Sequence, residues 1–340
     1  MRVSPGERTT SSSKGKLAFL SAISGTLAPL SFLLLLSIAL WFLSPNFATR
    51  DNLKQIAVQA AVVAILACGQ TAVIISGNID LSVASVMAFA GVAAAQAMSH
   101  HLVGVWGGVG IACLSGLILG IVSGLVTAFG RIPSFIVTLG MMGIARGAAG
   151  IISNSVTIGG LPEGFQVFGF GELFGSETRD GIPYAVLMMA AAAVGVHVIL
   201  ARTRWGRALY AMGGNQEAAR LSGINLRRAI TGVFALSGLL AGFAAIVNVS
   251  RASVASKDAG LGYELDAVAA TVVGGTSLFG GQGGIPGTII GAFLIYTIRN
   301  GCNLRGLSPD YQSAIIGAVV ILAVLYDRYG PGRRASEGRT

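Results

Sequence analysis

The sequence predicts an all-α integral membrane protein, a polytopic helix bundle with about ten transmembrane helices. Apolar residues make up 53% of the 340 residues, charged residues only 11%, and the mean hydropathy is +0.74. Soluble domains carry about 25% charged residues. Glycine is also frequent, with 49 residues, roughly twice its usual share of about 7%. Abundant glycine is typical of membrane helices whose backbones pack closely.

Apolar runs long enough to cross a bilayer, about 17–25 residues each, recur along the chain. They predict ten spans: 27–43, 54–76, 81–98, 105–128, 134–152, 182–201, 229–249, 264–279, 285–301 and 311–326. Three of them, 81–98, 264–279 and 285–301, are short or interrupted by glycine. We expect one transmembrane domain over 27–328, with polar cytoplasmic tails at 1–26 and 329–340 that are disordered. No small-residue cleavage site follows the first run, so we expect it to be retained as an anchor.

The basic residues predict the orientation of these spans. If both termini are cytoplasmic, 15 Lys and Arg residues lie on the cytoplasmic side and 7 on the outside, with Arg146 inside a span. This bias follows the positive-inside rule. The segment 153–181 is then external, and 202–228 is the largest cytoplasmic loop. The net charge of +9 needs no nucleic-acid partner to explain it.

Several function classes lack the residues that they need. The phosphate-binding loop Gly-x-x-x-x-Gly-Lys-Ser/Thr is absent, and the loop 202–228 is far too short for a nucleotide-binding domain. We therefore expect no ATPase site, no cofactor and no enzyme activity in this chain. His100 and His101 are adjacent, but no carboxylate or cysteine at ligand spacing accompanies them, so we expect no metal site. Cys68, Cys113 and Cys302 are interpreted as buried free thiols.

The cytoplasmic loop contains a predicted short helix. Asn215 can accept a backbone N–H at its start, and Glu217 in the first turn suits the positive end of the helix dipole. Gly223 favours a left-handed stop at its end. Ala218 and Ala219 then form a small-residue face that can fit a groove on a partner, while Arg220 can meet an acidic group. A plain interfacial helix would carry the same residues.

Two polar interruptions of apolar sequence are candidates for a pathway or gate. Asn78 and Asp80 separate the second and third runs, and ionisable residues at membrane depth are functional candidates. Asp80 can also serve only as the N-cap of a helix that starts at Leu81. Arg146 lies about twelve residues into its span, where it can either extend outward to the interface or line a polar cavity.

Two further segments are polar or rich in glycine. We expect the run 273–287 to be a tight cytoplasmic turn between closely packed helices, because no Lys-Ser/Thr follows its glycines. Asn300 and Asn303 belong to a polar external corner, which can contact a docked binding protein or simply be a hydrated loop.

Taken together, these segments resemble the permease subunits of bacterial ribose/xylose/galactose-type ABC importers. The matching pieces are SGNIDLSVASVMAFAG, TLGMMGIARG, GGNQEAARLSGINLRR, VVGGTSLFGGQGGIPGT and NGCNLRGLSPDYQ…VILAVLYDR. They occur in the family's order and cover most of the chain from about residue 40 to 328. The sequence departs from the family at Asn78 and Ala84, where glycine is more usual, and both departures add bulk near the expected pathway.

The resemblance implies a membrane subunit of the bacterial inner membrane that passes a monosaccharide, a ribose-like pentose or a hexose. A separate cytoplasmic ATPase subunit would use the ATP and dock on a coupling helix formed by Glu217, Ala218, Ala219, Arg220 and Gly223. A periplasmic binding protein would deliver the sugar. A second permease subunit, identical or different, would complete the pathway within the lipid. An ABC permease for branched-chain amino acids and an ion-coupled secondary transporter are the alternatives.

Overall fold

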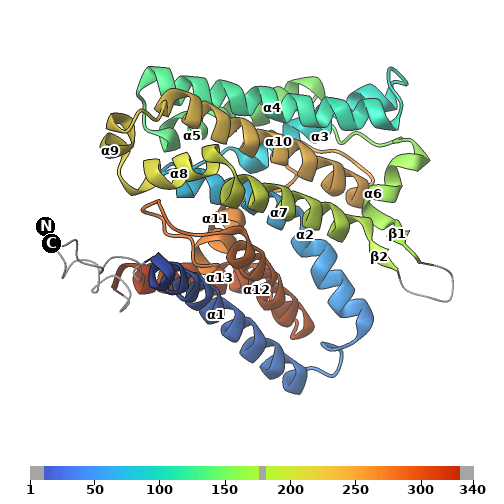
Figure 1. The fold of residues 1–340 in the computed structure, drawn as a ribbon. Helices are drawn as coiled ribbons and strands as arrows, with labels where there is room; N and C mark the ends of the chain where they lie inside the picture. The colour runs from blue at the N-terminus through green and yellow to red at the C-terminus, as the bar shows by residue number, and fades with distance from the viewer. Residues whose placement is uncertain (1–10, 176–180, 330–340) are drawn as a thin grey trace, which may run out of the picture.

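Each expected apolar run contains one helix in the computed structural model, which describes residues 11–175 and 181–329 (Figure 1). The ten helices are α1 (Ser11–Leu43), α2 (Arg50–Ile75), α3 (Val83–Ser99), α4 (Val105–Gly130), α5 (Ser134–Ile152), α7 (Tyr184–Arg202), α10 (Leu226–Ala252), α11 (Tyr263–Val273), α12 (Ile285–Leu304) and α13 (Pro309–Tyr329). Residues 1–10 and 330–340 of the expected tails lie outside the described residues.

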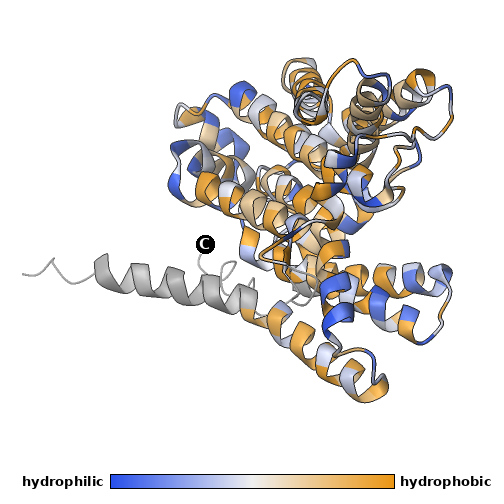
Figure 2. Cartoon of the chain, turned by 90° about the vertical axis from the view of Figure 1, so that its right-hand side faces the viewer, coloured by the Kyte–Doolittle hydropathy of each residue, from blue (hydrophilic) through white to orange (hydrophobic). Residues whose placement is uncertain are grey.

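Five of these helices are both long and apolar enough to cross a membrane: α2, α4, α5, α7 and α10. Shorter apolar helices cover 27–43, 83–99 and 309–325. Large apolar side chains such as Phe42, Ile118 and Ile144 face outward with more than half of their surface exposed. Figure 2 shows hydrophobic residues along the helices and hydrophilic residues mainly at helix ends and connections. An exposed apolar surface of this extent fits lipid rather than water, so the all-α, multi-pass membrane class is confirmed.

Two expected boundaries are wrong. The tail 1–26 is expected to be disordered, but α1 begins at Ser11, well before the expected start of the first run at residue 27. The run 264–279 predicts a span of sixteen residues, but α11 ends at Val273 and is followed by a loop over 274–284. At 1.5 Å per residue α11 rises only about 16 Å, roughly half of a hydrocarbon layer of about 30 Å. Several glycines in the loop, including Gly275 and Gly280, have positive φ angles that favour a turn over a helix.

Helix α2 forms the centre of the bundle. Its residues from Ala60 to Ile75 are all buried, because α7, α10, α11 and α12 pack around it. The hydroxyls of Thr71 and Thr288 lie 2.6 Å apart and link α2 to α12. Most of α2 therefore contacts protein rather than lipid.

The closest pair of helices is α4 and α10, which meet through small residues. A methyl group added at Gly116 would collide with the carbonyl oxygen of Gly238, and one added at Gly242 would collide with that of Ala112. Small residues four apart let two backbones touch along their length. The abundance of glycine thus has the packing role expected from composition.

The connections contain short elements that periodicity alone does not predict. The expected external segment 153–181 holds η1 (Glu163–Gln166), α6 (Val167–Phe170) and β1 (Glu172–Leu173). Its partner strand β2 (Ile182–Pro183) falls at the start of the expected span 182–201 and pairs with β1 in a two-stranded hairpin. The loop 202–228 holds α8 (Arg204–Gly214) and α9 (Gln216–Leu221). Figure 1 places α8 and α9 at one end of the bundle, which we call the α9 end, and the hairpin at the other, which we call the hairpin end.

Candidate functional site

Helix α9 has the start and stop that its sequence predicts. The Asn215 side-chain oxygen accepts a hydrogen bond from the Ala218 N–H at 2.9 Å. At the other end Gly223 has a φ of 83°. The Gly223 N–H donates to the Arg220 carbonyl, and the Ile224 N–H donates to the Ala219 carbonyl at 3.1 Å. These two bonds form the usual glycine-terminated helix end, so α9 is a short and well-closed helix.

The outer face of α9 is charged. Glu217 and Arg220 are exposed and form an ion pair at 2.5 Å. The Arg220 guanidinium lowers the pKa of Glu217 by hydrogen bonding to it. Ala218 is exposed, but Ala219 is buried against the rest of the chain. The expected face of two alanines is therefore wrong in one respect, because only Ala218 points outward.

Immediately before α9, the end of α8 is locked against two other segments by backbone contacts. A methyl group at Gly213 would collide with the Ile75 carbonyl oxygen at the end of α2 and would lie 2.5 Å from the Gly281 nitrogen. The Gly281 N–H itself donates to the Ile75 carbonyl at 2.9 Å. We call this three-way contact of Ile75, Gly213 and Gly281 the glycine junction.

A side chain strengthens the same junction. The Tyr210 hydroxyl on α8 donates to the Gly283 carbonyl at 2.9 Å, which fastens α8 to the 274–284 loop. Only Asn215 separates α8 from α9. Helix α9 is thus connected, through α8, to the end of α2 and to the 274–284 loop. Gly213 is not among the residues predicted from the sequence. Its one local signal is the Gly213-Gly214 pair before the Asn215 cap.

The connection between α2 and α3 is partly buried, and its Asp80 side chain is almost fully enclosed. The Asp80 carboxylate accepts hydrogen bonds from the Ser82 N–H at 2.9 Å, the Ser82 hydroxyl at 2.6 Å and the Ser237 hydroxyl on α10 at 2.8 Å. Helix α3 begins at Val83 with Ser82 at the N-cap position, so the prediction of Asp80 as the N-cap is wrong by two residues. Asp80 instead ties the helix start to α10.

The rest of this connection is held by neighbours as well. The Ile79 N–H donates to the Ser134 hydroxyl and the Leu81 N–H to the Thr138 hydroxyl, each at 3.1 Å, from the first turns of α5. The Asn78 amide bonds to the Ser76 hydroxyl at 2.9 Å. The loop that bears both polar candidates is therefore bonded to α5 and α10 and lies beside the glycine junction.

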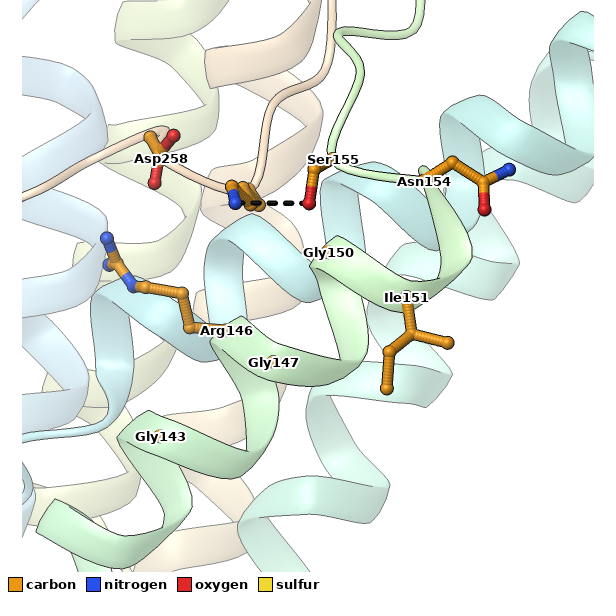
Figure 3. Close-up of a pocket in the computed structure, with 9 residues that line it drawn as sticks. Gly143, Arg146, Gly147, Gly150, Ile151, Asn154, Ser155 and Asp258 are labelled. Carbon is orange, nitrogen blue, oxygen red and sulfur yellow. Dashed lines mark hydrogen bonds between the residues drawn. The ribbon is translucent and has the colours of Figure 1, made fainter.

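Arg146 lines a pocket near the hairpin end, with a volume of about 700 Å³. Its guanidinium donates to the Ser85 hydroxyl of α3 at 3.1 Å and 3.2 Å. Figure 3 shows the Arg146 side chain extending from α5 toward the loop that carries Asp258. Of the two alternatives for Arg146, the polar cavity is the one that the geometry supports.

Asn303 lines a second pocket, of about 400 Å³, between α2 and the ends of α10, α11, α12 and α13. Asn300 lies outside that lining and forms a reciprocal amide pair with Asn52, at 2.6 Å and 3.0 Å. Asn52, the partner of Asn300, is not among the residues predicted from the sequence. The polar residues predicted for the pathway thus occupy separate places: Asn78 and Asp80 at the α9 end, and Arg146 and Asn303 in two different pockets.

Comparison with known proteins adds a family to this geometry. Residues 52–324 match the family described as branched-chain amino acid transport system / permease component. The ribose import permease protein RbsC of Escherichia coli strain K12 is 42% identical over 94% of this chain and 98% of its own length.

A permease of the same name from another bacterium and a permease named for another sugar are also similar over most of their lengths. The RbsC protein of Bacillus subtilis strain 168 is 39% identical over 89% of this chain and 92% of its own length. The L-arabinose transport system permease protein AraH of Escherichia coli strain K12 is 37% identical over 84% of this chain and 85% of its own length. The family match over 52–324 includes the loop 202–228 and the residues that line both pockets.

Proposed function

The chain belongs to the permease-component family of branched-chain amino acid transport systems, and we propose that it is the membrane subunit of an ABC importer for a monosaccharide. The observation that carries the proposal is the close likeness, over almost the whole chain, to the ribose import permease. ATP hydrolysis is assigned to a separate cytoplasmic subunit. The location that follows is the bacterial inner membrane.

The proposed topology has ten crossings and cytoplasmic termini. Helix α2 runs from the second pocket at Gln59 to the glycine junction at Ile75, whereas α10 runs the other way and ends at that pocket with Ala252, which supports alternating directions. The short helix α11 starts with Tyr263, which lines the second pocket at the hairpin end. The loop that follows reaches the glycine junction at Gly281. The segment 263–281 therefore runs from the hairpin end to the α9 end. Arg227 and Arg228 at the α9 end can meet anionic headgroups of the cytoplasmic leaflet.

The proposed docking site for the ATPase subunit is the exposed face of α9. Glu217, Ala218 and Arg220 are accessible there, while Ala219 holds the helix to its own chain. When the ATPase subunits close, α9 would move with them. The glycine junction would then carry this movement to α2 and to the loop that bears Asn78 and Asp80.

The proposed cycle is alternating access. The ATPase subunit drives it only if ATP binds one conformation of the complex more tightly than the other. A periplasmic binding protein would release its sugar at the hairpin end, where both pockets lie. A second permease subunit, identical or different, would face this one across the pathway.

A second candidate substrate is a branched-chain amino acid, because the family description names that class. The relatives named above are sugar permeases, which favours the monosaccharide. The ion-coupled alternative has no support from the family.

The test is uptake of radiolabelled sugars into proteoliposomes that contain the chain with its neighbouring ATPase subunit and binding protein. We expect D-ribose or a related sugar to accumulate only when all three components and ATP are present. Accumulation of L-leucine instead of a sugar would mean that the substrate is a branched-chain amino acid. Uptake by the chain alone along an ion gradient would overturn the importer assignment.

A further inference from the structure

The second pocket has walls of unusual chemistry for a membrane protein. Its lining contains four amide side chains, two tyrosines and two arginines, with only two apolar residues: Gln59, Asn248, Asn303, Gln312, Tyr263, Tyr296, Arg251, Arg299, Val62 and Ala252. Five helices supply these residues. Its volume of about 400 Å³ lies within the usual range for small-molecule sites.

The charges in this pocket are already tied to the protein. Arg299 forms a two-pronged ion pair with the buried Asp266, at 2.7 Å and 2.8 Å. One guanidinium nitrogen of Arg251 donates to the Val58 carbonyl at 3.0 Å. Asp266 neutralises the charge of Arg299, whereas Arg251 is held by a neutral carbonyl and keeps its positive charge in the wall.

The four amide side chains of the pocket form fewer hydrogen bonds to the described residues than they have groups available. Asn303 and Gln312 bond to each other at 2.6 Å. Gln59 and Asn248 are half-buried and make no side-chain hydrogen bond to the residues that the structure describes. The Arg299 Nε is buried and likewise has no partner among those residues. Partly or fully buried polar groups normally have hydrogen-bond partners, so this wall offers several unused donors and acceptors.

These groups fit a hydroxyl-rich neutral molecule. An amide presents both donors and acceptors, and so does each hydroxyl of a sugar. The tyrosines add ring faces with polar tips, and Tyr296 is fixed beside Arg299 with its ring centroid 5.8 Å from the guanidinium carbon. A branched-chain amino acid would need an apolar recess for its side chain, but Val62 and Ala252 are the only aliphatic residues in this lining.

We propose that this pocket is a monosaccharide subsite within a single permease subunit, which receives the sugar at the hairpin end before it passes inward. The assignment of the ligand class rests on the proposed function. The first pocket differs, because Arg146, Lys257 and Asp258 line it with charges.

The test compares two identical substitutions one helical turn apart on α2. Gln59→Met removes an amide from the pocket with little change in volume, whereas Gln55→Met alters an exposed glutamine outside it. Binding of D-ribose to the purified full-length chain in lipid nanodiscs is measured by saturation-transfer NMR. Uptake by the complete complex is measured in parallel. Tyr263→Phe, which removes a single hydroxyl, serves as a second variant if Gln59→Met does not fold.

We expect Gln59→Met to weaken D-ribose binding at least tenfold and to raise the apparent KM for uptake, and Tyr263→Phe to shift both measurements in the same direction. Gln55→Met should match the wild type in both measurements. If the complete complex imports sugar and the pocket variants bind and transport it normally, the subsite is overturned and the importer assignment stands. If the wild-type complex imports no sugar, the proposed function itself fails. Binding of L-leucine in preference to D-ribose at this pocket would overturn the ligand class.

Discussion

The two ends of the bundle are built in different ways. At the α9 end, segments far apart in the sequence touch through their backbones at Ile75, Gly213 and Gly281. At the hairpin end, the helices are fastened by side chains, as in the Asn52–Asn300 amide pair and the Arg299–Asp266 ion pair, and two polar pockets remain between them.

This difference follows from what each end is proposed to do. Backbone contact at the glycine junction leaves no side chain that can rotate away, so we expect α9, the end of α2 and the 274–284 loop to move together. Polar side chains around a pocket can change partners, so they can exchange a bond to each other for a bond to a solute. In the proposed importer, we therefore expect force to enter at the α9 end and the solute to be received at the hairpin end.

The largest expected effect comes from placing the same bulky residue at both ends. Gly213→Val would drive two methyl groups into the Ile75 carbonyl and the Gly281 backbone, and neither can move aside. Overpacking typically costs about 1–3 kcal/mol, and a clash with backbone places this variant at the upper end of that range. At Gly147 on α5 nothing lies within 4 Å of an added Cβ, so Gly147→Val should leave folding unchanged. Thermal unfolding in detergent measures both; equal melting temperatures would contradict the contrast.

A smaller effect is expected where side chains fasten the hairpin end. Asn300→Leu leaves the side-chain oxygen of the buried Asn52 without its donor, while the Asn52 nitrogen keeps its bond to the Phe47 carbonyl. The free energy of unfolding should therefore fall by about 1–3 kcal/mol. Replacing both residues by Leu removes the unpaired amide and should restore part of that loss. A double-mutant cycle measured by thermal unfolding checks this, and additive losses would show that the two amides do not act as a pair.

The stop of α9 provides a local test. Gly223 has a φ of 83°, where an alanine costs roughly 1–2 kcal/mol. Gly223→Ala should therefore loosen the end of α9 and weaken binding of the ATPase subunit several-fold, while the melting temperature of the bundle stays nearly constant. Surface plasmon resonance with the permease in nanodiscs measures the affinity. An unchanged affinity would mean that the ATPase subunit does not recognise the closed helix.

The smallest effect concerns the exposed ion pair. The pKa of Glu217 is lowered by its hydrogen bond to Arg220. The pair therefore contributes above the ordinary glutamate pKa and is lost as pH falls through the lowered value. Carbon-13 NMR titration of Glu217 should give a pKa below that of a free glutamate, and Arg220→Gln should return it to the ordinary range. If the pKa of Glu217 is unchanged in Arg220→Gln, the ion pair with Arg220 is not the cause of the lowered pKa.

Local patterns account for much of what the sequence predicts correctly. Periodic apolar runs locate the ten helices, and the residues of α9 predict both of its ends, because capping depends on neighbours within a few positions. The position of Arg146 in a span leaves two alternatives open, and only the packing of α3 beside α5 decides between them.

The errors and omissions depend on contacts between distant residues. The Asp80 carboxylate bonds to Ser237, which is 157 residues away along the chain, and the Asn52–Asn300 pair joins residues 248 apart. The glycine junction combines α2, α8 and the 274–284 loop, so Gly213 has no local signal beyond its double glycine. The second pocket needs five helices, and no single segment reveals it.

The most direct test of the stiff α9 end is a pair of matched substitutions in the complete transport complex. Gly213→Ala and Gly214→Ala are neighbours in α8, but only the first meets other backbone, since nothing lies within 4 Å of a Cβ at Gly214. The measurement is ATP-driven sugar uptake, with binding of the ATPase subunit recorded on the same samples. The account predicts that both variants bind the ATPase subunit and that only Gly213→Ala loses uptake. Normal uptake by Gly213→Ala would contradict the claim that the glycine junction carries the coupling.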